Sequence, residues 1–212
     1  MSTTISPSIL GGSFANMQDT IKLIDQSKAE YIHFDVMDGD FVPNLTFGPQ
    51  FISNVRQYSK KIFDVHLMIN RVGKFLEDYI KAGSDIITFH LEIDEDIKEL
   101  ISKIKTNNIK CGIAIKPATP WEDLKPYLNN IDQIIIMTVE PGFGGKKFME
   151  DHLLKIDQLK NYISQNQLNV DLEVDGGVNY ETGKKCIDAG ANILVAGSFL
   201  FKQENLSHAS NE

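Results

Sequence analysis

The sequence predicts a single (β/α)8 barrel, the TIM-barrel fold, with a short or incomplete final helix. Short apolar and β-branched runs recur about eight times along the chain, which is the number of strands in such a barrel. Segments with helical periodicity lie between them, and this alternation is typical of a parallel sheet covered by helices. A doubly wound open sheet is the alternative, but such sheets usually have only about five or six strands.

The chain length agrees with a barrel. The chain has 212 residues, near the lower limit of about 200 for a complete barrel. No Pro-, Ser- or charge-rich linker interrupts the pattern, so we expect residues 1–212 to form one domain with a polar tail from about residue 203. Little apolar periodicity remains after Ser198, and the short final helix is predicted for that reason.

Each predicted strand is a short run of apolar, β-branched or aromatic residues. In order, these runs are Ile5–Leu10, Tyr31–Met37, Phe63–Met68, Asp85–His90, Cys111–Ile115, Gln133–Val139, Val170–Val174 and Ile193–Ala196. The intervening helices are predicted where apolar residues repeat on one helical face, as at Phe14, Met17, Ile21 and Ile24, and again at Ile97, Leu100, Ile101 and Ile104. Trp121 is expected to start a helix and to serve in packing.

Composition and charge exclude several classes of function. The net charge is −8, which disfavours a long binding surface for nucleic acid or anionic lipid, so any anionic ligand must be held locally. The two cysteines match no metal-ligand spacing. We expect no membrane association, because no apolar run approaches the roughly 20 residues of a span and the first residues do not resemble a secretory signal. A cytoplasmic location is therefore expected.

Acidic and imidazole side chains gather at the carboxyl ends of three predicted strands. His33 and Asp35 alternate on one face of the second strand, His66 lies on the third, and Asp175 ends the seventh. In a barrel all four converge at the mouth, and mixed N and O donors suit Zn²⁺, Fe²⁺, Mn²⁺ or Co²⁺. The alternative is that the histidines are hydrogen-bonded core residues and the acids are loop caps. Spacing alone leaves both interpretations open.

Glycine-rich turns follow the last three predicted strands. They would expose backbone N–H groups at one sector of the rim, where barrels hold phosphate. Ordinary turn chemistry is the alternative for any one turn, but clustering on neighbouring strands favours a phosphate site. The residues concerned are Gly142, Phe143, Gly144, Gly145, Gly176, Gly177, Gly197 and Ser198.

Several other side chains near the expected mouth have two interpretations. Met37, Met68 and Met137 at strand ends would form a soft apolar ring, although gap-filling core is the commoner role of methionine. His90, near Glu92, either supports a metal ligand or is a hydrogen-bonded rim residue, and we expect the latter. Lys116 precedes a proline and is expected to be an exposed loop charge rather than a Schiff-base lysine.

Taken together, these motifs resemble the ribulose-phosphate 3-epimerase family, in order and from Ile5 to about Phe201. The matching segments are SPSIL at Ser6–Leu10, HFDVMDGDFVPN at His33–Asn44, DVHLM at Asp64–Met68, MTVEPGFGGKKFMED at Met137–Asp151, EVDGG at Glu173–Gly177 and AGS at Ala196–Ser198. Two positions depart from the common pattern, since Asp40 replaces a usual histidine and Lys146 replaces a common glutamine.

The resemblance implies a (β/α)8 isomerase that interconverts D-ribulose 5-phosphate and D-xylulose 5-phosphate in the pentose phosphate pathway. It implies His33, Asp35, His66 and Asp175 as ligands of one divalent metal, and Asp35 and Asp175 as the acid/base pair. Ser8, His66 and Asp175 would contact the sugar phosphate together with the glycine turns, and the three methionines would cap it. A homo-oligomer, a dimer or larger, is expected because barrel enzymes often assemble.

Three alternatives to this function remain. A 3-epimerase of a six-carbon ketose phosphate, such as allulose 6-phosphate, would use the same metal and acids. A phosphate-binding barrel lyase would carry an Asp-x-Lys-x-x-Asp motif after the third strand, but His66 stands where that lysine would be. A barrel retained only for binding or structure would be expected to have lost a ligand or an acid, and none is missing.

Overall fold

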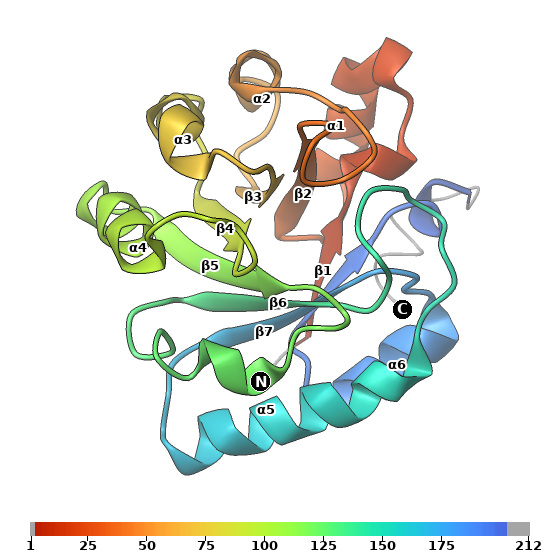
Figure 1. Cartoon of the computed structure of the whole chain (residues 1–212). Coiled ribbons are helices and arrows are strands. Elements are labelled where there is room, and N and C mark those ends of the chain that lie inside the picture. Colours follow the sequence, from red (N-terminus) through yellow and green to blue (C-terminus); the bar gives the residue numbers. More distant parts are fainter. Residues whose placement is uncertain (1–2, 203–212) are drawn as a thin grey trace.

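The structure is a computed structural model that describes residues 3–202, and in it eight parallel strands form one barrel sheet (Figure 1). The strands are β1 (Thr4–Pro7), β2 (Tyr31–Met37), β3 (Ile62–Met68), β4 (Ile86–His90), β5 (Lys110–Ile115), β6 (Gln133–Met137), β7 (Asp171–Asp175) and β8 (Ile193–Ala196). Consecutive strands from β2 to β8 are paired, and β8 pairs with β1. A single parallel bridge between Ser8 and His33 joins β1 to β2 and closes the ring. The predicted (β/α)8 barrel is confirmed.

Helices lie outside the strands, as Figure 1 shows. They are α1 (Met17–Asp25), α2 (Pro49–Arg56), α3 (Val72–Lys81), α4 (Ile97–Thr106), α5 (Leu153–Gln165) and α6 (Tyr180–Asp188). Between β5 and β6, the helix expected at Trp121 is only a short 3-10 helix, Trp121–Leu124. After β8, the described chain adds the 3-10 helix Leu200–Lys202. The predicted polar tail from about residue 203 lies outside the described residues, and the single domain over 1–212 stays a prediction.

Strand alternation divides each strand between two environments. On β2, Ile32, Phe34 and Val36 belong to the apolar core that the helices cover, whereas His33 and Asp35 point into the barrel. All of β2 is buried. A polar residue on the inner face therefore has no access to bulk water except at the mouth, and the inner face is where chemistry-bearing side chains meet.

Two predicted strands end earlier than expected. The first ends at Pro7 rather than Leu10, because Ser8 caps the 3-10 helix Ile9–Gly11 by accepting a hydrogen bond from the backbone N–H of Leu10 at 3.3 Å. The sixth ends at Met137 rather than Val139. Because β1 and β6 end early, the side chains that follow Pro7 and Met137 lie on the rim of the barrel, whereas a longer strand would have alternated them between its two faces. Within residues 3–202, no helix is both long and apolar enough to cross a membrane.

Candidate active site

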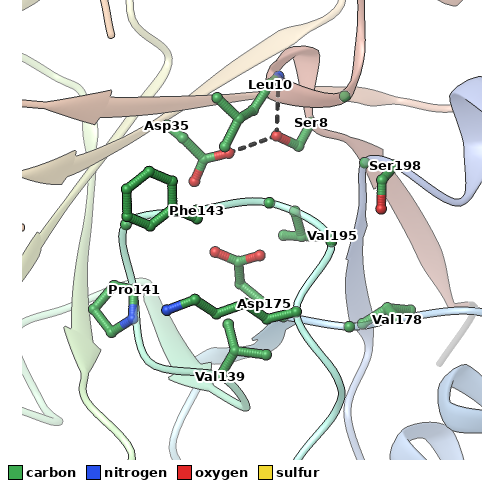
Figure 2. Close-up of a pocket in the computed structure, with 18 of the residues that line it drawn as sticks. Ser8, Leu10, Asp35, Val139, Pro141, Phe143, Asp175, Val178, Val195 and Ser198 are labelled. Carbon is green, nitrogen blue, oxygen red and sulfur yellow. Dashed lines mark hydrogen bonds between the residues drawn. The ribbon is translucent and has the colours of Figure 1, made fainter. Parts of the chain in front are cut away.

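A cavity of about 470 Å³ opens at the carboxyl ends of the strands (Figure 2). Asp35 and Asp175 face each other across it in this view, with Ser8 beside Asp35. The residues predicted to contact substrate that line it are Ser8, Gly142, Phe143, Gly144, Gly145, Asp175, Gly176, Gly177, Gly197 and Ser198. His66, also predicted, is fully buried beneath this lining. Val139, Val195 and Lys202 also line the cavity, and they were not predicted from the sequence as site residues.

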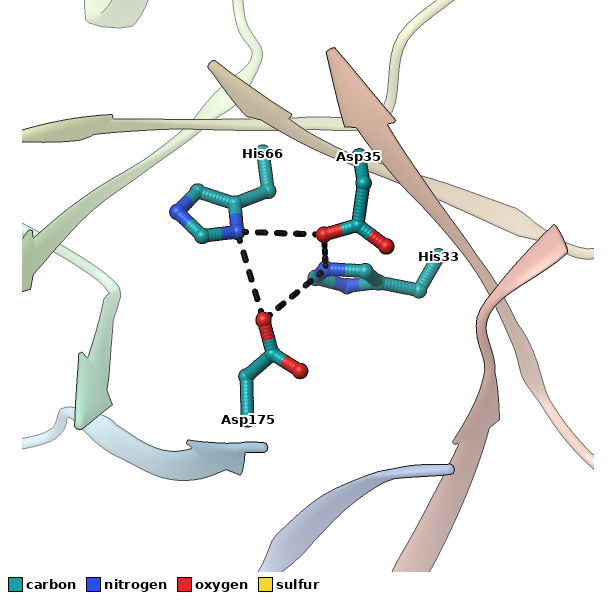
Figure 3. A group of neighbouring side chains, drawn as sticks. All are labelled: His33, Asp35, His66 and Asp175. Carbon is teal, nitrogen blue, oxygen red and sulfur yellow. Dashed lines mark ion pairs between the residues drawn. The ribbon is translucent and has the colours of Figure 1, made fainter. Parts of the chain in front are cut away.

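Four side chains from three strands meet at the base of the cavity (Figure 3). His33 Nε2 lies 3.4 Å from Asp35 Oδ1 and 4.0 Å from Asp175 Oδ2. His66 Nδ1 lies 3.6 Å from the same oxygen of Asp35 and 3.6 Å from Asp175 Oδ2. One potential ligand atom from each residue lies within 4.8 Å of the other three. The structure thus brings together the four residues that were predicted as metal ligands.

The far ring nitrogen of each histidine has a partner, and the near one has none. His33 Nδ1 lies 2.7 Å from Asp64 Oδ2, and His66 Nε2 lies 2.9 Å from His90 Nε2. His33 Nε2 and His66 Nδ1 are buried and have no hydrogen-bond partner among the residues that the structure describes. Buried polar atoms are normally satisfied, so two such nitrogens aimed at two carboxylates fit a divalent cation between them.

The pKa shifts within the cluster also favour a cation between these four side chains. Burial raises the pKa of Asp35, but the neighbouring imidazoles of His33 and His66 outweigh it and hold that pKa below its usual range. Burial lowers the pKa of His33, but Asp35 and Asp64 outweigh it and raise that pKa well above its usual value. The carboxylates therefore favour the protonated, positively charged form of the histidines. A metal ion would supply that charge instead, because a ligating imidazole must be neutral.

A second polar layer lies below His33. Asp64 Oδ1 accepts a 3.1 Å hydrogen bond from Gln133 Nε2, which also donates to Glu173 Oε2. Asp64, Gln133 and Glu173 are all fully buried. Asp64 orients the imidazole of His33, a role that the sequence analysis did not assign. Its position two residues before His66, on the same strand face, was the signal that pointed to it.

Backbone turns shape the sector beside Asp175. Gly176 and Gly177 have φ of +125° and +69°, and a Cβ on Gly177 would lie 2.5 Å from the backbone nitrogen of Phe148. The chain can therefore turn and approach its neighbour only with glycine here. Across the rim, Asn44 Nδ2 donates a 2.7 Å hydrogen bond to the Gly142 carbonyl. The loop after β2 is thereby tied to the glycine-rich loop after β6.

The three predicted methionines lie under the mouth. Met37 and Met68 are register partners on adjacent strands and belong to one apolar cluster, while Met137 packs with Val139 in another. All three line the cavity and have at most 3% of their surface exposed. They form an apolar, polarisable surface at the cavity wall.

His90 and Glu92 lie behind His66. His90 Nδ1 lies 3.0 Å from Glu92 Oε2. Burial lowers the pKa of His90 to about 4. Burial raises the pKa of Glu92, but its contacts, led by the hydrogen bond with His90, prevail and lower it to about 2. At neutral pH the pair is a neutral imidazole beside a carboxylate.

Three other residues that the sequence analysis discussed lie at the edge of the barrel mouth. Asp40 accepts a 2.9 Å hydrogen bond from Asn70 Nδ2 on the exposed rim. Lys146 Nζ donates at 3.0 Å to the Glu140 carbonyl. Lys116 Nζ lies 3.8 Å from the centre of the Phe41 ring. Neither of the two departures from the motif pattern, Asp40 and Lys146, lies in the four-residue cluster.

Comparisons with known proteins identify relatives over nearly the whole chain. The model of the ribulose-phosphate 3 epimerase family matches residues 4–201. A ribulose-phosphate 3-epimerase of Bacillus subtilis (strain 168) is 40% identical over 209 residues, covering 98% of this chain and 96% of the relative. A chloroplastic ribulose-5-phosphate-3-epimerase of Arabidopsis thaliana is 39% identical over 207 residues, covering 97% of this chain and 74% of the relative.

Solved structures share the architecture at low sequence identity. The tryptophan synthase alpha subunit of Campylobacter jejuni superposes with a TM-score of 0.69 at 16% identity, covering 99% of this chain and 93% of its own. KGPDC of Streptococcus mutans superposes with a TM-score of 0.68 at 14% identity, covering 99% of this chain and 94% of its own. At these identities the likeness establishes the barrel fold alone.

Proposed function

The chain belongs to the ribulose-phosphate 3-epimerase family, and we propose that Asp35 and Asp175 exchange the protons in its interconversion of D-ribulose 5-phosphate and D-xylulose 5-phosphate. The observation that carries this assignment is the pair of carboxylates that meet at His66 Nδ1, each 3.6 Å away. They come from β2 and β7, which are separated in the ring by β1 and β8. A sugar bound in the mouth therefore has a carboxylate on each of two sides.

The reaction needs two such groups. Epimerisation at C3 removes the proton from the carbon next to the ketone on one face and returns a proton on the other. One aspartate takes the proton to give an enediolate, and the protonated partner then donates to the opposite face. In the reverse direction the two exchange roles. Ser8 Oγ donates a 2.5 Å hydrogen bond to Asp35 Oδ2 and holds that carboxylate in place.

His33, Asp35, His66 and Asp175 would hold one divalent ion, for which we propose Zn²⁺, Fe²⁺, Mn²⁺ or Co²⁺. The two unpartnered ring nitrogens and the mixed donor set support it. When bound, such an ion supplies Lewis-acid stabilisation of the negative charge that develops on the sugar, worth several kcal/mol.

The rest of the mouth positions the sugar phosphate. We propose that the backbone N–H groups of the glycine turns after β6, β7 and β8 bind the phosphate, which suits a chain of net charge −8 because no basic patch is required. The methionines Met37, Met68 and Met137 face the reacting end and exclude water from it. Holding the phosphate at one side places a single carbon between the two aspartates.

Asparagine substitutions test the pair of aspartates. We expect Asp35→Asn and Asp175→Asn each to lower kcat by at least about 10²–10⁴-fold, the contribution of a positioned acid or base. Asp40→Asn, on the exposed rim, is the matched control and should keep the wild-type kcat. Circular dichroism and metal content verify that each variant is folded and loaded. A near-native kcat in either active-site variant would contradict the mechanism.

Solvent exchange separates the two roles. In deuterium oxide, a variant that keeps only one aspartate should still exchange the C3 proton of one epimer, the one whose proton faces the remaining carboxylate. Asp35→Asn and Asp175→Asn should then differ in which epimer exchanges, as measured by NMR. Exchange of both epimers in one variant would mean that a single group serves both faces.

The size of the sugar is a separate question, because a six-carbon 3-epimerase would use the same groups. Parallel assays with ribulose 5-phosphate and allulose 6-phosphate decide it, and we expect a higher kcat/KM for the five-carbon substrate.

The cytoplasmic location and the homo-oligomer also remain our proposals. Fractionation of the source cells tests the former, and light scattering on a sizing column tests the latter.

A further inference from the structure

A row of three side chains leads from the candidate metal site to the loop after β5. The imidazoles of His66 and His90 stack with ring centroids 5.0 Å apart and an interplanar angle of 27°, and their Nε2 atoms lie 2.9 Å apart. His90 Nδ1 lies 3.0 Å from Glu92 Oε2. Both imidazoles are fully buried, so their ring protons must be placed within this row.

Glu92 is anchored at its other oxygen. Glu92 Oε1 accepts a 2.7 Å hydrogen bond from the backbone N–H of Lys116 and a further one from Thr119 Oγ1. Oε1 therefore holds the loop, whereas Oε2 faces His90. A carboxylate can only accept, so the His90 proton lies on Nδ1.

That assignment determines the next contact. Two ring nitrogens at 2.9 Å need one donor and one acceptor. Within residues 3–202, His66 Nδ1 makes no hydrogen bond, so the ring proton of His66 belongs on Nε2, which is the donor, and His90 Nε2 is the acceptor. His66 then carries its proton on the side away from the mouth. Its buried Nδ1 then presents a lone pair to Asp35 and Asp175.

We propose that Glu92, acting through His90, is a positioning residue that keeps the proton of His66 on Nε2 and so keeps Nδ1 available as a metal ligand. This inference rests on the proposed function, in which His66 holds the ion. Outer partners of this kind fix the tautomer and ring orientation of ligating histidines. His33 has the equivalent support from Asp64 by a direct 2.7 Å contact, whereas His66 reaches its carboxylate through a second imidazole.

The first test is the tautomer of His90 in the zinc-loaded protein. The chain has 5 histidines, and ¹⁵N labelling of their rings resolves the protonation of each nitrogen by NMR. His66→Gln and His90→Gln spectra assign the signals. We expect His90 to be neutral with its proton on Nδ1, and His66 to carry its proton on Nε2. A His90 protonated at Nε2, alone or in addition to Nδ1, would overturn the proposal without any need for a Glu92 variant.

The second test is the affinity for zinc. We expect Glu92→Gln to raise the Kd for zinc by about 10–100-fold, measured by competition with a chelator, and to change the ring-nitrogen spectrum of His90. It should lower kcat but change the KM for sugar phosphate by less than about twofold, because the phosphate grip is separate. Glu122→Gln is the matched control, since it removes an exposed carboxylate and should leave the Kd for zinc, the His90 spectrum, kcat and KM unchanged.

His66→Gln distinguishes the two possible failures. If it binds zinc as tightly as the wild type, His66 is not a ligand and the metal site of the proposed function is wrong. If His66→Gln loses zinc while Glu92→Gln retains both the wild-type Kd and the wild-type His90 spectrum, the site is right and the role of Glu92 is wrong. Should Glu92→Gln fail to fold, the wild-type spectrum alone decides.

Discussion

At the scale of single residues, Ser8 shows how the end of a strand becomes part of the site. Its backbone forms the bridge to His33 that closes the barrel. Its hydroxyl accepts from the Leu10 backbone N–H at 3.3 Å and donates to Asp35 Oδ2 at 2.5 Å. Ser8 is 95% buried, with 5% of its surface exposed, so water would not readily replace the lost donor. One side chain thus links closure of the ring to the position of a proposed catalytic carboxylate.

We therefore expect Ser8→Ala to lower kcat about ten- to a hundredfold, because a hydrogen bond to a charged group contributes roughly 1.5–3 kcal/mol. Steady-state kinetics on metal-loaded enzyme measures this change. Ser6→Ala, two residues earlier, is the matched control, since the buried Ser6 hydroxyl has no hydrogen-bond partner in the described part of the chain. It should keep the wild-type kcat. Equal effects of the two substitutions would argue against a specific role for the Ser8 hydroxyl.

Residue alternation made much of the site predictable. His33 and Asp35 are two positions apart on one strand, so any barrel that contains this strand turns both inward. The role of Glu92 was not predicted, because it depends on a loop after β5 that supplies the Lys116 and Thr119 donors. Contacts made by a loop leave no periodic pattern of apolar residues in the sequence, so such a pattern cannot predict them. His90, expected from the sequence to be a hydrogen-bonded rim residue, is fully buried behind His66.

At the scale of elements, the connection between β5 and β6, all of which the structure describes, contains no α-helix. A 3-10 helix, Trp121–Leu124, stands where a longer helix was expected. Trp121 covers this part of the barrel: its ring packs 5.2 Å from that of Tyr162 on α5, and its Nε1 donates to Gln158 Oε1 at 3.2 Å. The indole of Trp121 thus packs against α5 where a longer helix would otherwise have covered the barrel.

Trp121→Ala should therefore destabilise the fold by about 3–5 kcal/mol, the usual cost of removing a buried large aromatic side chain. Trp121 has only 8% of its surface exposed, whereas Phe75, the matched control, has 37%. Phe75→Ala should cost clearly less. Urea unfolding followed by far-ultraviolet circular dichroism gives both values, because that signal does not depend on the tryptophan. A cost below about 1 kcal/mol for Trp121→Ala would show that this region does not depend on the indole.

The strands were easier to predict than the elements that join them. Burial on both faces makes each strand a continuous apolar run, and the predicted positions agree with the structure to within a few residues. Trp121 and Ser8 mark the exceptions. The chain at Trp121 forms one 3-10 helix whose indole packs against Tyr162 of α5, and β1 ends where the Ser8 side chain accepts from the backbone of Leu10, two residues further on. Neither contact belongs to the apolar periodicity from which the strands and helices were predicted.

At the scale of the whole molecule, the four proposed ligands join distant parts of the ring. His33 and Asp35 lie on β2, His66 on β3 and Asp175 on β7. The β1–β2 seam between them is bridged at a single position, whereas β2 and β3 are in register along seven residue pairs. A cation held by all four would therefore tie the two sides of the weakest seam together across the mouth.

Metal binding should accordingly stabilise the entire fold. An ion that binds only the folded chain contributes about 4.1 kcal/mol at a concentration of 1,000 times its Kd. For a chain of this size that corresponds to a rise in Tm of roughly 8–16 °C. Chelated protein titrated with zinc or cobalt in a calorimeter measures the shift, and activity should return in step with one bound equivalent.

His66→Gln tests whether the stabilisation arises at this site. The variant lacks one of the two cluster nitrogens that have no hydrogen-bond partner within residues 3–202 and should lose most of the metal-dependent rise in Tm. His152→Gln, which removes an imidazole outside the cluster, should keep it. If both variants keep the full rise, the ion binds elsewhere. If chelation changes neither Tm nor kcat in the wild type, the cluster at the mouth works without a metal, and the histidines alone would have to offset the repulsion between the paired carboxylates.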